Sequence, residues 1–319
     1  MEQGLRELGA TGLRVTAICV GTASLGSSSY TYGTTVSAEQ GEAVVEAALA
    51  GPYTFLDTSN AYGRGASETC IGTVLGRHGG VPEGIVLATK VDADPVTRDF
   101  SGDRVRRSVE ESLTRLGLDS VPLMYLHDPE FFLTVPQALA DDGPVAAMVA
   151  LRDEGVLGHL GVAMGDVAME RELVKSGAFE VVLNHNRHTL LDRGAEPLIE
   201  EARERGVAFV NAAPYGGGLL SRGLDHKRNY GYRPAPDAVV AAVSAMQQVC
   251  AAHGVPLAAA ALQFSLRDPR VSATVVGMSS PDRIEQTTAL ASYPIPDEVW
   301  PRLEALLPPR EHWMADHQA

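Results

Sequence analysis

Short apolar runs alternate with longer amphipathic segments eight times along this chain, and this alternation limits the folds it can adopt. The apolar runs are rich in β-branched residues, as buried strands are, and the segments between them place apolar residues three and four positions apart, as helices do. Predicted helices include residues 37–50, 103–117 and 195–206. The predicted strands are residues 17–21, 54–57, 85–89, 121–127, 160–163, 181–184, 208–212 and 273–277. The pattern predicts an α/β fold, a (β/α)8 TIM barrel, with a doubly wound open sheet as the alternative.

Three segments lie outside this repeat. Residues 5–18 contain two short alternating runs around Gly9 and Gly12, which predict an N-terminal β-hairpin. Residues 221–236 predict a long loop after the seventh strand, which either covers a ligand or is a disordered surface segment. Residues 296–307 predict an extra C-terminal helix, followed by a tail on the outside of the barrel. No linker divides residues 1–319, so a single domain is expected.

Composition excludes several classes of function. The net charge is −14 and no lysine- or arginine-rich stripe is present, so nucleic acid binding is not expected. No apolar run is long enough to cross a bilayer and the first residues do not resemble a signal peptide, so a cytoplasmic protein without a membrane partner is expected. The three cysteines, Cys19, Cys70 and Cys250, are far apart and odd in number. They are interpreted as buried thiols rather than as disulfides or zinc ligands.

Four polar residues end or follow the second, third and fourth predicted strands. Asp57, Lys90 and His127 stand at strand ends, and Tyr62 follows Asp57 in the segment FLDTSNAYGRG. In a barrel the carboxyl ends of the strands meet at one face, so these side chains are expected to share a pocket. A tyrosine phenol has a pKa of about 10 and needs a nearby cation before it exchanges protons near neutral pH.

This set predicts proton transfer to or from a carbonyl oxygen. Tyr62 would carry the proton, with Lys90 stabilising its phenolate. Asp57 would keep Lys90 charged and fixed in direction, and His127 would donate a hydrogen bond to the substrate oxygen. Each residue alone also fits an ordinary loop, surface or core role, and it is their joint position that favours catalysis. A barrel aldolase with Lys90 as a Schiff base is a second enzyme hypothesis.

The chain resembles the aldo-keto reductase family over nearly its whole length. The resemblance is carried by GTASLG, FLDTSNAYG, ATK, LHD and VVGMSSPDRIEQT. It implies that Asp57, Tyr62, Lys90 and His127 form the family's catalytic tetrad. LHDPE, NRHTLLD and NAAPYGGGLL further resemble the branch that contains D-threo-aldose, L-fucose and L-galactose 1-dehydrogenases and some pyridoxal dehydrogenases.

The resemblance also implies a cofactor, NADP or NAD, bound extended across the barrel mouth and without a metal. No G-x-G-x-x-G motif follows the first strand, which agrees with binding outside a Rossmann domain. The backbone around Ala213, Tyr215 and Gly217 is expected to meet the pyrophosphate. The other cofactor-binding positions that the family motifs imply are Gly21, Thr22, Gly277, Met278, Ser279 and Arg283.

Two departures from the family pattern concern the nicotinamide. Ala163 and Met164 replace the Ser-Asn pair that many relatives have after the fifth strand, and Ala212 replaces an aromatic residue that commonly stacks on the ring. Asn184, at the end of the sixth strand, is either a substitute contact for the carboxamide or a turn residue. Its neighbour His185 is an equal rival for that contact.

A third departure concerns the adenosine end of the cofactor. NADPH-preferring relatives often have a lysine before the S-x-x-R segment, where this chain has Gly277. Arg283 remains, and an arginine there binds a 2′-phosphate, stacks on adenine, or simply lies on a helix surface. NAD is therefore as open a choice as NADP.

The sequence thus predicts an oxidoreductase that transfers a hydride between a nicotinamide and the carbonyl or hydroxyl carbon of an aldose or small aldehyde. The alternatives are a general NADPH-dependent carbonyl reductase, a pyridoxal dehydrogenase and, in another class, a nicotinamide-binding regulatory protein. His185 and His188 have no evident third ligand, so no metal site is expected. Candidates for the substrate pocket walls, or for ordinary packing, are Tyr30, Phe131 and Phe132.

Overall fold

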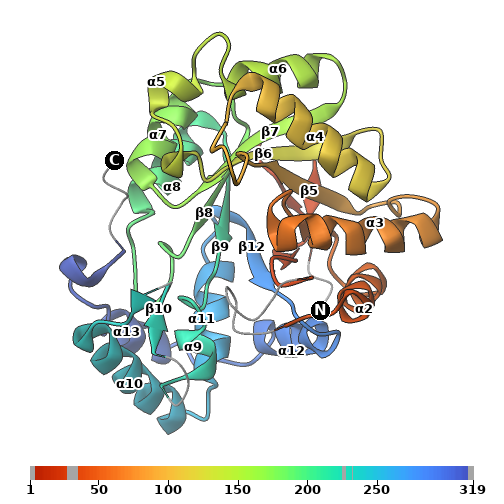
Figure 1. Ribbon diagram of the computed structural model, residues 1–319. Helices are drawn as coiled ribbons and strands as arrows, with labels where there is room; N and C mark the ends of the chain where they lie inside the picture. The colour runs from red at the N-terminus through yellow and green to blue at the C-terminus, as the bar shows by residue number, and fades with distance from the viewer. Residues whose placement is uncertain (1–3, 27–34, 225–227, 232, 315–319) are drawn as a thin grey trace.

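Eight parallel strands form a closed barrel in the computed structural model of this protein (Figure 1). The structure describes residues 4–26, 35–224, 228–231 and 233–314. The last strand pairs with both the seventh and the first, which closes the ring and confirms the barrel over the open sheet. In order around the barrel the strands are β3 (Ile18–Gly21), β4 (Phe55–Asp57), β5 (Val86–Val91), β6 (Val121–His127), β7 (Leu157–Met164), β8 (Val181–His185), β9 (Ala208–Ala212) and β12 (Val271–Gly277).

Helices surround the strands (Figure 1). The three helices named from the sequence are confirmed, because Ser37 and Ser101 cap two helix starts and Gly117 and Gly206 end two helices in the left-handed conformation. The helices are α2 (Ala38–Ala50), α3 (Ala66–His78), α4 (Gly102–Leu116), α5 (Val135–Ala138), α6 (Pro144–Asp153), α7 (Val167–Lys175), α8 (Glu196–Arg205), α9 (Leu219–Arg222), α10 (Asp237–Ala252), α11 (Leu257–Leu266), α12 (Asp282–Ala291) and α13 (Val299–Glu304).

Strand residues alternate between two apolar cores. Successive side chains of a strand point to opposite faces, so each strand sends every second residue into the barrel and the others toward the helices. In β6, for example, Leu123 and Tyr125 belong to the cluster inside the barrel, while Met124 and Leu126 belong to the cluster under the helices. The cysteines are buried and free, as the sequence predicts: Cys19, Cys70 and Cys250.

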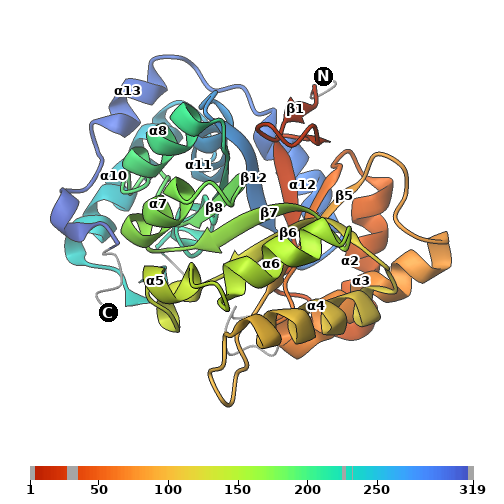
Figure 2. The same ribbon diagram turned by 90° about the horizontal axis from the view of Figure 1, so that it is seen from above.

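The predicted N-terminal hairpin is present and covers the amino end of the barrel (Figure 2). It consists of β1 (Arg6–Glu7) and β2 (Arg14–Val15). Leu8 and Val15 are fully buried in the cluster inside the barrel, and the Arg6 guanidinium donates hydrogen bonds to the carbonyl oxygens of Leu266 and Val271. The hairpin therefore covers the amino end of the barrel.

Two segments differ from the sequence prediction. Within residues 221–236, expected as a loop, the described residues include a short hairpin of β10 (Asn229–Tyr230) and β11 (Arg233–Pro234). It is held because the buried Tyr230 phenol donates a 2.9 Å hydrogen bond to Asp192 Oδ2. Residues 225–227 and 232 of this segment lie outside the described residues. The final helix, α13, is shorter than the predicted 296–307, since its last turn tightens to bonds between residues three apart.

The described part of the tail packs on the loop that follows β8. The backbone N–H of Met314 donates a 2.8 Å hydrogen bond to Asp192 Oδ2, and the Met314 side chain packs on the apolar cluster around α10 and α13. The tail therefore reaches a loop at the carboxyl end of the barrel, beyond the outer surface where the sequence placed it.

None of the helices in the described ranges is by itself long and apolar enough to cross a membrane. The pair α10 and α11 meets the length and composition only when combined, and a bend of 99° separates the two helices. The cytoplasmic location stays a prediction.

Candidate active site

The four residues singled out in the sequence meet at the carboxyl end of the barrel. Asp57 ends β4, Lys90 lies near the end of β5 and His127 ends β6. Along its strand, each lies an even number of residues from side chains that fill the barrel interior, as Asp57 does from Phe55. Alternate residues of a strand share a face, so all three side chains point inward. Asp57 and Lys90 are almost completely buried, with 3% and 1% of their surfaces exposed.

Lys90 is the centre of the group. Its Nζ lies 2.7 Å from Asp57 Oδ1, 2.7 Å from the Thr58 carbonyl oxygen and 3.1 Å from the Tyr62 hydroxyl. An ammonium ion has three N–H donors, and here each has an acceptor. This arrangement opposes the Schiff-base hypothesis, because an amine nucleophile needs a free lone pair.

Tyr62 is positioned by a tight turn between β4 and α3. It starts a short 3-10 segment, η1 (Tyr62–Gly65), in which Gly63, Arg64 and Gly65 all have positive φ. A side chain at Gly65 would meet the Arg115 guanidinium at 2.5 Å. Arg115 itself donates to the Asn60 carbonyl oxygen, so the YGRG sequence and α4 together fix the loop that carries the phenol.

Asp57 and Lys90 form a buried ion pair. Desolvation raises the pKa of Asp57, and the adjacent charge and hydrogen bonds of Lys90 oppose that rise. Asp57 Oδ2 is buried and has no hydrogen-bond partner among the described residues. The pair therefore holds a positive charge next to the Tyr62 phenol, whose ring centroid lies 4.5 Å from Lys90 Nζ.

Asp92 is a member of the site that the sequence reasoning missed. Its Oδ1 lies 2.7 Å from His127 Nδ1, and its Oδ2 accepts hydrogen bonds from Ser59 Oγ at 2.5 Å and from the Ala61 backbone N–H at 2.9 Å. Asp92 stands two residues after Lys90 and so has the same parity. That spacing is the signal by which it could have been found.

Acidic side chains lie beside His127 on its other side. Asp128 Oδ2 is 3.7 Å from His127 Nε2, and Asp128 Oδ1 is 3.7 Å from His185 Nε2. Glu130 Oε1 accepts hydrogen bonds from the backbone N–H groups of Gly165 and Asp166. Burial would raise the pKa of Asp128, but the nearby charges of His127 and His185 lower it to about 2. Asp128 thus stays a carboxylate at the barrel mouth.

Several expected cofactor-binding residues lie together at the ends of the neighbouring strands β3 and β12. Gly21 ends β3, and its carbonyl oxygen accepts a 3.0 Å hydrogen bond from the Met278 N–H. The Thr22 hydroxyl donates to the Asp57 carbonyl oxygen, which ties this edge to the catalytic group. Gly277 is exposed with open space around it, and Ser279 follows it half-buried.

A second group of expected residues follows β9. Ala213 has a φ of 57°, and Gly216, Gly217 and Gly218 also have positive φ. Arg283, near the start of α12, lies close enough to Tyr215 for its charge to oppose the rise in the Tyr215 pKa, which burial takes to about 12. The loop after β9 and the start of α12 are therefore adjacent.

Asn184 is placed differently from its expected role. Its neighbours Val182 and Leu183 belong to the outer and inner clusters respectively, so Asn184 points outward with Val182. Its Nδ2 donates to Glu170 Oε2 at 2.8 Å and to the Met164 carbonyl oxygen at 3.2 Å, and its surface is fully buried. The inward-pointing residue at this strand end is the rival, His185.

The residues present fit the phosphate portion of a nicotinamide dinucleotide. Among the described residues, no hydrogen bond is donated by the backbone N–H groups of Tyr215 and Gly217. Free N–H groups next to left-handed residues form an anion-binding concavity. Ala213 is one of these residues, and its left-handed backbone is strained because it is not a glycine. Arg283 adds a cation beside the same turn.

The aromatic candidates for pocket walls are divided. Phe132 packs edge-on against Phe100 with ring centroids 5.8 Å apart, which is a packing role. Phe131 is 44% exposed on the same short segment. Tyr30 lies outside the described residues.

His185 and His188 do not form a pair. His188 is buried, with Nε2 at 3.3 Å from Asp268 Oδ2 and Nδ1 at 3.8 Å from Glu196 Oε1. Arg270 donates hydrogen bonds to both of those carboxylates. His188, Glu196 and Asp268 thus lie together in the described part of the chain, and the Arg270 guanidinium pairs with both carboxylates.

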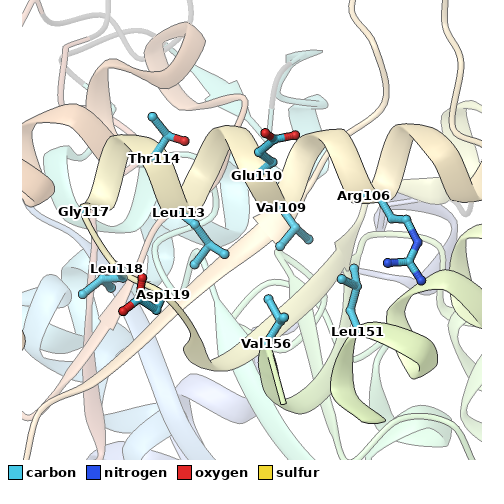
Figure 3. Close-up of a pocket in the computed structure, with 10 residues that line it drawn as sticks. All are labelled: Arg106, Val109, Glu110, Leu113, Thr114, Gly117, Leu118, Asp119, Leu151 and Val156. Carbon is cyan, nitrogen blue, oxygen red and sulfur yellow. The ribbon is translucent and has the colours of Figure 1, made fainter. Parts of the chain in front are cut away.

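The hollow drawn in Figure 3 lies away from this site. It has a volume of about 500 Å³, and Val109 and Leu113 point into it from α4 (Figure 3). Leu118 and Val156, which also line it, precede β6 and β7. The hollow therefore belongs to the amino end of the barrel, opposite the four residues.

The chain belongs to the aldo/keto reductase family, whose model matches residues 17–308. It is accordingly an oxidoreductase. Its fold is similar to that of the aldo-keto reductase AKR11C1 from Bacillus halodurans in the holo form, with a TM-score of 0.78, 24% identity and 96% of each chain covered.

Three relatives are similar to this protein over almost the full chain. Pyridoxal 4-dehydrogenase of Microbacterium luteolum is 30% identical and covers 94% of this chain and 96% of its own. L-galactose dehydrogenase of Arabidopsis thaliana is 31% identical, covering 96% of this chain and 94% of its own. D-threo-aldose 1-dehydrogenase of a Pseudomonas species is 31% identical, covering 94% and 97%. The relatives include the sugar and pyridoxal dehydrogenases that the sequence motifs resemble.

Proposed function

We propose that this protein is an NAD(P)-dependent aldose dehydrogenase in which Tyr62 transfers the proton. The observation that carries the proposal is the buried ammonium of Lys90, held by Asp57 at 2.7 Å and bonded to the Tyr62 hydroxyl at 3.1 Å. A cation at that distance favours the phenolate over the phenol, which makes the phenol a competent proton carrier near neutral pH.

The four residues divide the chemistry among them. When bound, the nicotinamide supplies or accepts the hydride at the substrate carbon. Tyr62 releases its proton to the carbonyl oxygen in reduction and takes the hydroxyl proton in oxidation, and Lys90 stabilises the phenolate in both directions. His127 orients the substrate oxygen. Asp57 keeps Lys90 in place and balances its charge.

The cofactor would be held by the turn after β9 and by α12. The backbone N–H groups of Tyr215 and Gly217 would bind the pyrophosphate, and Gly21, Thr22, Met278 and Ser279 would line the opposite edge. Arg283 would face the adenosine end. His185 replaces Asn184 in this proposal as the polar group at the nicotinamide, because it points into the barrel mouth.

A polyhydroxylated substrate is favoured over a simple aldehyde. The carboxylate of Asp128 lies 3.7 Å from His127 Nε2, where it would accept hydrogen bonds from sugar hydroxyls. Two of the relatives, L-galactose dehydrogenase and D-threo-aldose 1-dehydrogenase, are named for such substrates. Pyridoxal is the second candidate, supported by the similarity to pyridoxal 4-dehydrogenase.

A paired assay of cofactor and substrate tests the proposal. NAD⁺, NADP⁺, NADH and NADPH would each be followed at 340 nm with a panel of aldoses, pyridoxal and simple aldehydes. We expect oxidation of aldoses such as L-galactose, and NAD⁺ at least as effective as NADP⁺, since Gly277 leaves Arg283 as the one family-matched cation for a 2′-phosphate.

Other outcomes of that assay replace the proposal. Reduction of simple aldehydes with NADPH alone would identify a general carbonyl reductase and make Arg283 its phosphate ligand. Oxidation of pyridoxal alone would favour the second candidate. Tight cofactor binding with negligible turnover across the panel would support a regulatory protein.

A further inference from the structure

Asp92 and His127 form a dyad whose hydrogen bonds define the proton positions. The distance of 2.7 Å between Asp92 Oδ1 and His127 Nδ1 is that of a strong, charge-assisted hydrogen bond. Asp92 Oδ2 meanwhile accepts from the Ser59 hydroxyl and from the Ala61 backbone N–H. Two donors on Oδ2 favour the carboxylate form of Asp92, in which Oδ1 also accepts and the hydrogen of the dyad is on the imidazole.

This pairing fixes which ring nitrogen of His127 is protonated. A carboxylate only accepts, so Nδ1 must carry a hydrogen in every state in which the bond to Asp92 is made. Nε2 makes no hydrogen bond to the described residues, and its nearest carboxylate oxygen, on Asp128, is 3.7 Å away. Nε2 is therefore the nitrogen left for the substrate oxygen.

The chemistry of Nε2 then depends on the charge of the ring. A neutral imidazole with its hydrogen on Nδ1 has a lone pair on Nε2 and can only accept a hydrogen bond. It can donate to a carbonyl oxygen only as an imidazolium ion. The role expected for His127, donation to the substrate oxygen, thus requires a positive charge on this ring in the direction of reduction.

We propose that Asp92 is a positioning residue that holds His127 with its hydrogen on Nδ1, so that Nε2 donates a hydrogen bond to the substrate oxygen as part of an imidazolium ion. The inference rests on the function proposed above, and it deepens it: a positively charged His127 orients the substrate oxygen in both directions of the reaction. In oxidation the hydroxyl gives its one hydrogen to Tyr62, while the Nε2–H of His127 donates to a lone pair of the same oxygen.

The surrounding charges support a cationic ring. Burial alone would lower the pKa of His127, but the charges of Asp92 and Asp128 and the hydrogen bond that His127 donates to Asp92 outweigh it and raise that pKa. Lys90 opposes the rise. The titratable groups that face His127 or its partners from the packed elements are Asp57 of β4, Tyr62 of η1, Lys90 of β5, Asp92 after β5, Asp128 after β6 and His185 of β8.

Asp92→Asn is the decisive variant, because it reverses the hydrogen bond without changing the shape of the side chain. The asparagine oxygen can still accept from Ser59 and Ala61, which leaves its NH2 group to donate to His127 Nδ1. The neutral ring would then carry its hydrogen on Nε2. Asp94→Asn is the matched control, since Asp94 Oδ1 accepts from the backbone N–H groups of Val96 and Thr97 in its own turn.

The first measurement is ¹⁵N NMR of histidine-labelled protein without cofactor, with the His127 signals assigned by their loss in His127→Gln. Above the titration of the ring, we expect a protonated Nδ1 and a bare Nε2 in the unmodified protein and in Asp94→Asn, and the reverse in Asp92→Asn. A wild-type His127 with its hydrogen on Nε2 would overturn the proposal, and so would the same protonation pattern in Asp92→Asn.

The second measurement is the pH profile of kcat/KM for reduction. In the unmodified enzyme, kcat/KM should fall tenfold per pH unit above the titration of His127. In Asp92→Asn, kcat/KM should not fall over that interval. Below the titration it should be about tenfold lower than in the unmodified enzyme, because a neutral donor replaces a charged one. Retention of the wild-type limb in Asp92→Asn would contradict the proposal. Because the NMR experiment needs no turnover, its result stands even if the paired cofactor assay finds no activity.

Discussion

At the scale of single residues, the catalytic side chains depend on burial and on which face of a strand they occupy. Lys90 is charged in the barrel interior because three acceptors surround it, one of them the carboxylate of Asp57. The third acceptor is the Tyr62 hydroxyl, so the cation is bonded directly to the proposed proton carrier. Asp92 lies two residues after Lys90, and its carboxylate holds His127 as that of Asp57 holds Lys90.

Tyr62→Phe removes only the phenol oxygen and so tests whether Tyr62 carries the proton. We expect kcat to fall by about 10²–10⁴, because the proton carrier is lost. The dissociation constant of the cofactor, measured by calorimetry, should change little, since the phenol is proposed to act on the substrate oxygen. Tyr293→Phe is the control, because its hydroxyl donates to the Gly254 carbonyl oxygen away from the barrel mouth. Near-normal turnover in Tyr62→Phe would sink the proposed mechanism.

At the scale of elements, the contact between α3 and α4 supports the loop that carries Tyr62. The two helices approach closely at Gly72, where an added side chain would lie 1.9 Å from the Arg115 carbonyl oxygen. Arg115 also donates to Glu68 Oε2 on α3 and to the Asn60 carbonyl oxygen in the loop. Glu68 is fully buried, so its pairing with Arg115 ties the helices to the loop as one unit.

Two glycine substitutions in α3 are expected to have opposite effects. Gly72→Ala should lower the free energy of unfolding by about 1–3 kcal/mol, because the helices must separate to admit a methyl group. Gly76→Ala, one turn further along, meets no atom within 4 Å and should raise it by about 0.5–1 kcal/mol through helix propensity. Urea unfolding midpoints measure both. Equal effects from the two substitutions would contradict the close approach.

At the scale of the whole molecule, the two ends of the barrel have different tasks. The hairpin seals the amino end with Leu8 and Val15, while the catalytic group and the proposed cofactor loop lie at the carboxyl end. Stability and activity are thus assigned to opposite ends of one barrel, as is general for this architecture. We propose that residues 1–319 form a single domain on this basis.

Leu8→Ala tests whether the amino end of the barrel affects stability without affecting activity. Removal of this fully buried side chain should cost about 2–5 kcal/mol of the free energy of unfolding and leave KM within about twofold. Leu5→Ala is the control: Leu5 is 41% exposed, so the change should stay within about 0.5 kcal/mol. Thermal or urea unfolding, with steady-state kinetics on the folded enzyme, provides both readings. A large rise in KM would link the hairpin to the site.

The sequence by itself determined the barrel and the positions of the four central residues. Eight strand–helix periods are local patterns, and a barrel gathers all strand ends at one face, so Asp57, Lys90 and His127 could be placed together before any coordinates. The alternation of side chains between the two faces of a strand can also be predicted from the sequence. It would have placed Asp92 beside Lys90 and turned Asn184 away from His185.

Only the tertiary structure decided which of these side chains touch. The bond between Asp92 and His127 joins two strands, and its length depends on the stagger of β5 against β6 rather than on any local pattern. The adjacency of Arg283 to Tyr215 likewise needs the closure of β12 onto β9. The physical reason is that period and propensity act over a few neighbouring residues, whereas contacts across a closed sheet depend on the packing of the whole ring.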